Sequence, residues 1–199
     1  MFVLPAGHVQ IAFSGGRTSA YMLWRILEAN GALPSCAVVT FQNTGREMPE
    51  TLDFVQEVGA RWNVPIVWLE YRPTAPFFEV VSHNSAARNG EPFEALITKR
   101  KYLPNQQTRF CTVELKIRTA KRYLMSIGWR HWVNAIGIRA DEVQRLVNKD
   151  DSKDRWTTLL FSKRYSRREM REFMDRQGEL PLSIEGVLCQ KDDGECVAW

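Results

Sequence analysis

The sequence predicts an α/β protein with three layers, in which helices cover both faces of a mostly parallel β-sheet. Short runs of β-branched and aromatic residues alternate with longer segments whose apolar residues recur at helical spacing, and Gly and Pro mark the connections. Strands that alternate with helices favour right-handed crossovers and therefore parallel pairing. With 199 residues, 44% of them apolar, the chain can bury a core of its own as one domain.

The first strand, turn and helix carry the strongest functional signal. Residues 9–13 are β-formers with an apolar bias, two glycines follow at once, and a helix with one apolar face then runs to Gly31. A glycine-rich turn before a helix N-terminus can bind an anion, because its amide groups are unsatisfied and the helix dipole adds positive potential. The residues alone are equally compatible with a turn in which the glycines only allow a tight bend and bind no ligand. The turn consists of Ser14, Gly15, Gly16, Arg17, Thr18 and Ser19.

The alternation of strands and helices continues along the chain. Pro49 is well placed to begin a second helix, and residues 113–127 predict a long helix with a basic side. Residues 72–109 are broken repeatedly by Pro and Asn-Gly, and their pattern allows a short helix from Phe77 and another over residues 92–97. Further strands are expected at residues 37–41, 66–69, 132–136 and, at an edge, 157–161.

The composition favours a cytoplasmic protein that binds an anion. Four cysteines in a chain of this size do not form a disulfide scaffold, residues 1–7 lack the features of a signal peptide, and no apolar run could span a membrane. A net charge of +4 is compatible with an anionic ligand, but it is too small to indicate a nucleic-acid-binding protein by itself. The basic residues 97–102 fit either a lid over such a ligand or a solvated loop. No metal site is expected, because His8, His83 and His131 share no ligand spacing.

Four stretches together resemble the phosphoadenylyl-sulfate (PAPS) reductase family of the PP-loop, or adenine nucleotide alpha hydrolase-like, superfamily. The turn at 14–19 resembles the Ser-Gly-Gly-x-x-Ser PP-loop. Residues 43–51 resemble Asp-Thr-Gly-x-x-x-Pro-Glu-Thr, with Asn43 in place of the usual acid. Residues 109–116 are similar to Arg-x-Cys-x-x-x-x-Lys, and residues 137–145 to Gly-x-Arg-x-x-Glu-x-x-Arg. The four stretches cover most of the chain in the family's order, and short phage-borne members of this branch are similar.

The resemblance implies a five-stranded sheet of order 3-2-1-4-5 with an adenine nucleotide across the carboxyl ends of the strands. Residues 1–180 would form the PP-loop nucleotide-binding domain, and residues 181–199 a cysteine-containing C-terminal tail. The nucleotide- or phosphate-binding residues that it implies are Ser14, Gly15, Gly16, Arg17, Thr18, Ser19, Asn43, Thr44, Gly45, Arg109, Lys116, Gly137 and Arg139.

The resemblance also implies a catalytic cysteine in the tail. PAPS reductases attack the sulfate sulfur with a cysteine from a terminal Glu-Cys-Gly-Leu-His segment, and Glu195 with Cys196 matches its first two residues. The neighbouring acids oppose a thiolate at Cys196, so a cation such as Arg139, a bidentate donor to oxyanions, would have to reach it. Cys196 and Arg139 are therefore the candidate catalytic residues. An iron–sulfur cluster is not expected, because Cys111 follows Phe110 rather than a second cysteine.

Three functions are compatible with these residues, and none requires a cofactor. The first, favoured by residues 43–51 and 137–145, is a thioredoxin-dependent reductase that acts on PAPS. The second is an ATP pyrophosphatase that adenylates an acceptor such as a nucleobase. In that case the basic stripes at 116–122 and 163–171 would bind nucleic acid. Glu47 or Asp141 could then hold Mg²⁺ through the phosphates. The third is a non-catalytic nucleotide-binding protein.

Overall fold

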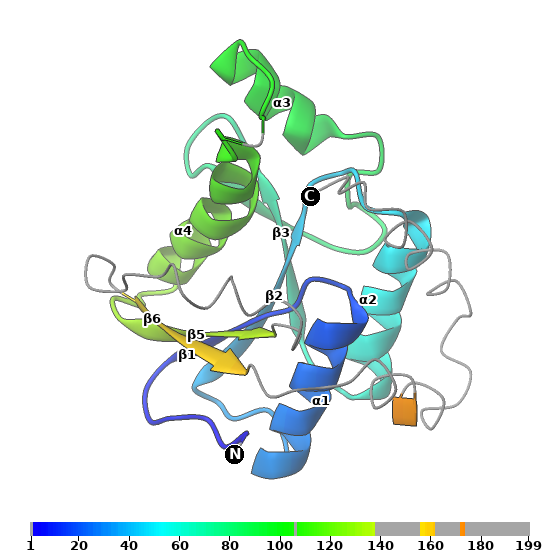
Figure 1. Ribbon diagram of the computed structural model, residues 1–199, viewed down its shortest axis with the longest axis vertical. Coiled ribbons are helices and arrows are strands. Elements are labelled where there is room, and N and C mark those ends of the chain that lie inside the picture. Colours follow the sequence, from blue (N-terminus) through cyan, green and yellow to red (C-terminus); the bar gives the residue numbers. More distant parts are fainter. Residues whose placement is uncertain (1, 106, 138–155, 162–171, 174–199) are drawn as a thin grey trace.

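The computed structural model describes residues 2–105, 107–137, 156–161 and 172–173, and these form a single sheet with helices on both faces (Figure 1). The six strands are β1 (Val9–Ala12), β2 (Ala37–Asn43), β3 (Ile66–Tyr71), β4 (Phe78–Val81), β5 (Trp132–Gly137) and β6 (Trp156–Phe161). They lie in the order β4-β3-β2-β1-β5-β6. The predicted α/β class and the mostly parallel sheet are thus confirmed.

The expectation of five strands in the order 3-2-1-4-5 is wrong, because the sheet contains one strand more. Counted along the chain, the order is 4-3-2-1-5-6, and β4 pairs antiparallel with β3 at one edge. The sequence allowed a helix at this point. Two of the four residues of β4, Glu79 and Val80, are exposed, so the strand lacks the apolar run that marks the buried strands. The parallel neighbours are β3, β2, β1, β5 and β6.

Helices α1 (Arg17–Asn30) and α2 (Pro49–Arg61) lie together on one face of the sheet, and α4 (Thr119–Ser126) lies on the other (Figure 1). Pro49 occupies the first turn of α2, as expected. Phe13, Phe41, Leu52 and Val55 are almost completely buried in the main core. None of the described helices is both long enough and apolar enough to cross a membrane.

The long helix expected over residues 113–127 is divided into two types of helix. Residues Thr112–Arg118 form a π-helix, η1, and α4 follows directly. The hydroxyl of Thr119 donates to the carbonyl of Glu114 at 2.8 Å, five residues earlier, in line with the wider spacing of a π-helix. Helix α3 (Glu91–Arg100) precedes η1 and contacts both η1 and β3. Short π-helical segments are rare and often accompany functional sites.

The parallel strands end on the same side of the sheet, where the candidate residues 14–19, 43–45 and 137 lie. Ala12 pairs in register with Thr40 of β2 and Ile136 of β5, and Asn43 pairs with Glu70 of β3. The segments that follow these strands therefore meet at the carboxyl edge, which is where α/β proteins bind ligands.

Candidate functional site

The turn after β1 holds Gly15 tightly against helix α2. Gly15 has a φ of +73°, and a Cβ built on it would lie 2.7 Å from Cγ2 of Thr51 and 3.1 Å from Cγ2 of Val55. A side chain here would be strained by the backbone conformation and by the contact with α2. Glycine is therefore required at this position by the packing of the turn, and the same packing places the turn at the carboxyl edge of the sheet.

Two serines organise the turn from opposite ends. The Ser19 hydroxyl donates to the carbonyl of Gly16 at 2.8 Å, and its oxygen accepts hydrogen bonds from the backbone N–H of Ser14 at 3.2 Å and from the Ser14 hydroxyl at 3.1 Å. Ser19 is buried and Ser14 is exposed. Ser19 thus shapes the turn, while Ser14 offers a hydroxyl to solvent. Helix α1 begins at Arg17. Its cap residue is Gly16, which has no side chain that could bond to the amide groups at the helix N-terminus.

The end of strand β5 lies directly beside this turn. A Cβ on Gly137 would come within 3.1 Å of the carbonyl oxygen of Thr18 in the first turn of α1. A larger residue at 137 would therefore push β5 away from the helix N-terminus. The structure thus brings together two of the stretches that carry the resemblance, although they are more than a hundred residues apart in the sequence.

Asn43 lies at the same edge, but its side chain points into the protein rather than toward a ligand. It is completely buried, its Nδ2 donates to Glu70 Oε1 at 2.7 Å and to the carbonyl of Ala87 at 2.8 Å, and its Oδ1 accepts the Gly45 N–H at 3.0 Å. Both ends of the amide are therefore occupied, and the partners fix its orientation. Asn43 joins the ends of β2 and β3 to the segment that precedes α3.

The two residues that follow Asn43 also make their contacts within the protein. Thr44 donates from its N–H to Glu47 Oε2 at 2.9 Å and from its hydroxyl to Glu47 Oε1 at 2.9 Å. Glu47, a candidate Mg²⁺ ligand, thus has both oxygens engaged by Thr44. Gly45 has a φ of +77° and packs on Gly90, whose Cα would lie 3.0 Å from a Cβ at 45. Gly45, an expected nucleotide-binding residue, therefore packs closely on another segment of the chain.

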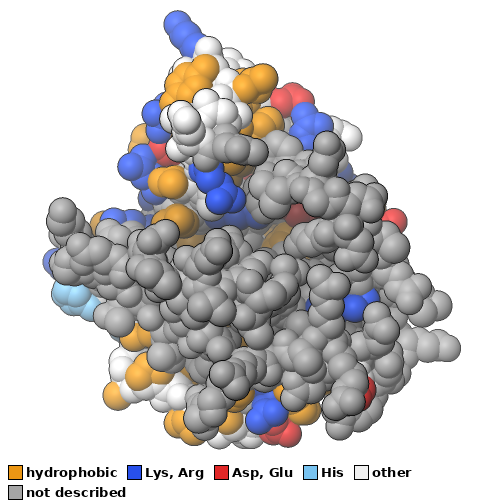
Figure 2. Space-filling view, in the orientation of Figure 1, with side chains coloured by type: hydrophobic (Ala, Val, Ile, Leu, Met, Phe, Trp, Pro, Cys, Tyr) orange, Lys and Arg blue, Asp and Glu red, His pale blue; other side chains and the backbone are white. Residues whose placement is uncertain are grey.

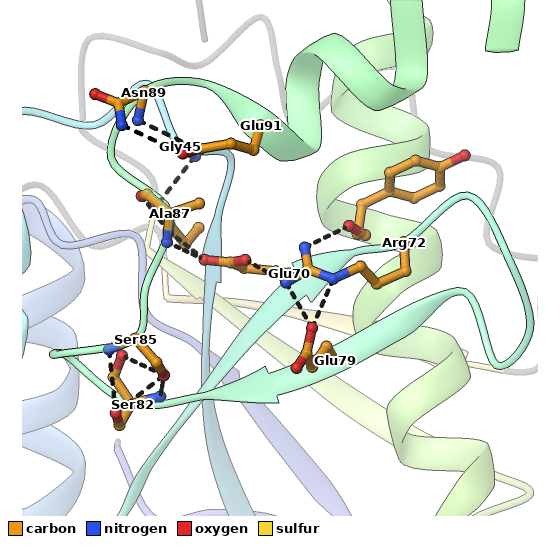
Figure 3. Close-up of polar contacts among 11 residues, drawn as sticks. Gly45, Glu70, Arg72, Glu79, Ser82, Ser85, Ala87, Asn89 and Glu91 are labelled. Carbon is orange, nitrogen blue, oxygen red and sulfur yellow. Dashed lines mark hydrogen bonds and ion pairs between the residues drawn. The ribbon is translucent and has the colours of Figure 1, made fainter. Parts of the chain in front are cut away.

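Glu70 is a buried carboxylate at the centre of this edge that the sequence analysis did not single out. Its Oε1 accepts hydrogen bonds from Asn43 and from the Ala87 N–H at 2.7 Å, and its Oε2 forms an ion pair with Arg72 at 3.0 Å (Figure 3). Arg72 also binds Glu79 of β4 with its Nε at 2.6 Å, so one arginine links β4 to the buried acid (Figure 3). The sequence signal was an acid directly after the expected strand 66–69; the observed strand runs to Tyr71 and includes it, and an acid is seldom buried unless it is paired.

A second buried carboxylate, Glu114, holds three arginines on the other face of the sheet. Its Oε1 binds Arg100 of α3 at 2.5 Å and Arg118 of η1 at 2.6 Å, and its Oε2 lies 3.7 Å from Arg122 of α4. Tyr71, at the end of β3, is buried beside them. Burial raises the pKa of the Tyr71 phenol, Glu114 adds to the rise and Arg122 and Arg100 oppose it, so the phenol is protonated at neutral pH.

Arg109 precedes η1 and Lys116 lies within it, on this second face. Within the described residues neither side chain forms an ion pair or hydrogen bond, and no such contact links either side chain to the turn at 14–19. Arg109 is exposed and Lys116 half-buried, so both are open to an anion from solvent. Arg139 and Cys196 lie outside the described residues, as do Asp141 and the expected tail at 181–199. The described site therefore consists of the turn at 14–19, the start of α2 and Gly137.

Sequence comparison relates the chain to a phage protein. No family model matches the chain. Over 148 residues, 70% of its length, the chain is 32% identical to a protein of Escherichia phage lambda described as "Uncharacterized nin region protein ORF290". The chain spans half the length of that relative.

A solved structure has a similar fold. The chain is similar to the phosphoadenylyl-sulfate (PAPS) reductase of Candida auris, crystallised as a phosphate complex, with a TM-score of 0.55 over 92% of this chain and 78% of that one. The fold is PAPS reductase-like. The sequence identity of 13% means that this similarity concerns the fold alone.

Proposed function

We propose that the protein is a PAPS reductase-like enzyme that binds an adenine nucleotide through the turn at residues 14–19. The observation that carries this proposal is the turn itself. Its glycine is packed against α2, its exposed Ser14 hydroxyl is oriented by buried Ser19, and it leads into a helix whose cap has no side-chain hydrogen bond. Amide groups at such a helix start suit a phosphate or sulfate group. The PAPS reductase-like fold supports the choice of nucleotide.

In the proposed reaction, Cys196 supplies the nucleophile and Arg139 neutralises the sulfate oxygens. The Cys196 thiolate attacks the sulfate sulfur, a bond forms between the two sulfur atoms, and the bond from sulfur to the bridging phosphate oxygen breaks. Adenosine 3′,5′-bisphosphate leaves, and Cys196 carries an S-sulfonate. A thioredoxin-like dithiol then attacks the Cys196 sulfur, releases sulfite and is oxidised to a disulfide as Cys196 becomes a thiolate again.

Replacing Cys196 with Ser tests the chemical step. We expect Cys196→Ser to lose sulfite release from PAPS with reduced thioredoxin while its affinity for adenosine 3′,5′-bisphosphate stays unchanged, because only the nucleophile is lost. Cys36→Ser, at a half-buried thiol before β2, is the matched control and should release sulfite like the wild type. Sulfite release by Cys196→Ser at the wild-type rate would show that another group performs the attack.

A different product would identify the related activity. If the protein releases pyrophosphate from ATP and forms no sulfite from PAPS, the same turn serves an ATP pyrophosphatase, and Mg²⁺ held through the phosphates would accompany the nucleotide. Binding of nucleotides without either product would identify a non-catalytic nucleotide-binding protein.

A further inference from the structure

Positive charge is concentrated in one short part of the chain. Residues 99–122 contain eight Lys and Arg residues and a single acid, Glu114, which gives a balance of seven positive charges. Because the whole chain carries 27 basic and 23 acidic residues, the other 175 residues have 19 basic and 22 acidic ones, a balance of three negative charges. Such asymmetry indicates a polyanionic partner for one face of a protein.

The fold brings part of this charge together. The basic residues 97–102, for which the sequence left a lid or a loop open, form the end of α3 and the two residues after it. They meet the basic side of η1 and α4 through the shared contact of Arg100, Arg118 and Arg122 with Glu114. Three guanidinium groups share one carboxylate, so two positive charges remain in excess. The side chains of Arg100 and Arg118 are 38% and 52% exposed, so these two guanidinium groups are accessible to a ligand from solvent.

Aromatic rings hold these cations in place. The guanidinium carbon of Arg100 lies 5.6 Å from the centre of the Phe110 ring, and that of Arg122 lies 4.9 Å from the Phe77 ring. The Nζ of Lys99 lies 5.0 Å from the same Phe77 ring. Guanidinium groups fixed in this way bind phosphate oxygens with little further loss of side-chain entropy.

Exposed apolar side chains lie beside the cations. Tyr102 is 48% exposed and Leu103 is 67% exposed, and the Tyr102 ring packs edge-on against Phe110 with 4.9 Å between the ring centres. Val113 and Ile117 of η1 are also exposed. Figure 2 shows Lys and Arg side chains interspersed with hydrophobic ones in the upper part of the molecule, where α3 and α4 lie.

We propose that this surface, formed by the basic and exposed apolar side chains of residues 99–105 and 107–122, binds single-stranded nucleic acid. The arginines around Glu114 and the flanking lysines contact successive phosphates, and Tyr102 offers a ring on which a base stacks. The observations favour a nucleic acid strand over an anionic lipid surface because the guanidinium groups are held at fixed positions and the exposed apolar groups include an aromatic face. The proposal concerns a surface outside the turn at 14–19 and holds whether or not the protein is a reductase.

Anisotropy of a fluorescent thymidine oligonucleotide of about 20 nucleotides tests the proposal with the full chain. We expect saturable binding at about 50 mM salt that weakens steeply toward about 200 mM. The variant Lys99→Gln, Lys101→Gln, Lys121→Gln changes neither Glu114 nor the candidate nucleotide site. It should bind about tenfold more weakly and lower the slope of log affinity against log salt by about 2, since each phosphate contact on a single strand contributes about 0.7.

Two further variants separate stacking and general charge from the proposed surface. Tyr102→Ala should weaken binding about fivefold with an unchanged salt slope, because base stacking does not depend on counterions. Arg61→Gln, Arg88→Gln, Arg130→Gln removes the same charge from exposed positions outside residues 99–122 and should bind like the wild type. The proposal is overturned if the oligonucleotide does not bind at about 50 mM salt or if both triple variants lose affinity equally. Tighter binding to a duplex of the same length, or to phosphatidylserine vesicles, would overturn it as well.

Discussion

Replacing Glu114 with Gln is expected to lower the free energy of unfolding by about 2–3 kcal/mol at pH 7, because the buried carboxylate loses its charged hydrogen bonds to Arg100 and Arg118. Glu114 is 7% exposed and contacts arginines from three different helical segments. Glutamine keeps the shape but carries no charge, so three guanidinium groups would face one another without a counterion. Because these arginines connect α3, η1 and α4, the loss should affect the packing of this whole face.

Urea denaturation of matched variants tests this expectation. Glu94→Gln removes an acid from α3 that is 63% exposed and pairs with Arg46 at 3.0 Å, and it should cost less than about 1 kcal/mol. Adding Arg118→Gln to Glu114→Gln should recover part of the loss, because it removes one of the uncompensated cations. If Glu114→Gln unfolds at the same urea concentration as Glu94→Gln, the cluster contributes no more than a surface pair.

The second large effect is expected for Asn43→Asp, which introduces the acid found at this position in the motif Asp-Thr-Gly-x-x-x-Pro-Glu-Thr that residues 43–51 resemble. In this protein Asn43 donates to buried Glu70 at 2.7 Å, so an aspartate would place two carboxylates in contact. They cannot both be ionised there, and one would have to bind a proton, with its pKa raised above the usual value. We expect a loss of about 2–4 kcal/mol at pH 7, equivalent to a rise of about 2–3 pKa units.

The pH dependence of this variant follows from the proton that it binds. At pH 7 the folded variant holds a proton that the unfolded chain has released, so its stability relative to the wild type should fall as the pH rises above about 4 and recover as the pH is lowered. Asn89→Asp, at an exposed asparagine that also contacts a glutamate, should show a much smaller change. Adding Glu70→Gln to Asn43→Asp should remove the pH dependence, because only one of the two groups can then be ionised. It should restore only part of the stability, because the aspartate cannot donate to the carbonyl of Ala87 as Asn43 does. Equal stability of Asn43→Asp and the wild type at pH 7 would contradict the buried contact.

The fold could be predicted from the sequence where local pattern and burial coincide. The residue pattern is enough to predict the apolar strands at 9–13 and 37–41 and the helix that begins at Pro49. The alternation of strands and helices then implies parallel pairing. Strand β4 could not be predicted in this way, because it is short and half-exposed. It is stabilised by its pairing with β3, which the local sequence does not reveal. The π-helical spacing of η1 likewise depends on how its side chains meet the sheet and α3.

The candidate site was only partly predictable for a related reason. The turn at 14–19 is a local motif, and its glycine, its serines and the helix that follows are contiguous in the sequence. The role of Asn43 depends on Glu70 and Ala87, which lie 27 and 44 residues further along the chain. Glu114 depends on Arg100, which precedes it by 14 residues in another helix. Sequence shows that these acids are present, but only the fold shows which partners neutralise them.

The most direct test of the central claim is calorimetric titration of the protein with ATP, adenylyl sulfate, PAPS and adenosine 3′,5′-bisphosphate under identical conditions. We expect binding of at least one adenine nucleotide, with a preference for the 3′-phosphorylated ligands if the protein is a reductase and for ATP if it adenylates an acceptor. Ser14→Ala should weaken the best ligand about tenfold or more, because a hydrogen bond to a charged group contributes about 1.5–3 kcal/mol. Ser35→Ala, at an exposed serine between α1 and β2, should leave the affinity unchanged. Absence of binding by all four ligands, or equal affinity of Ser14→Ala and the wild type, would contradict a nucleotide site at the turn of residues 14–19.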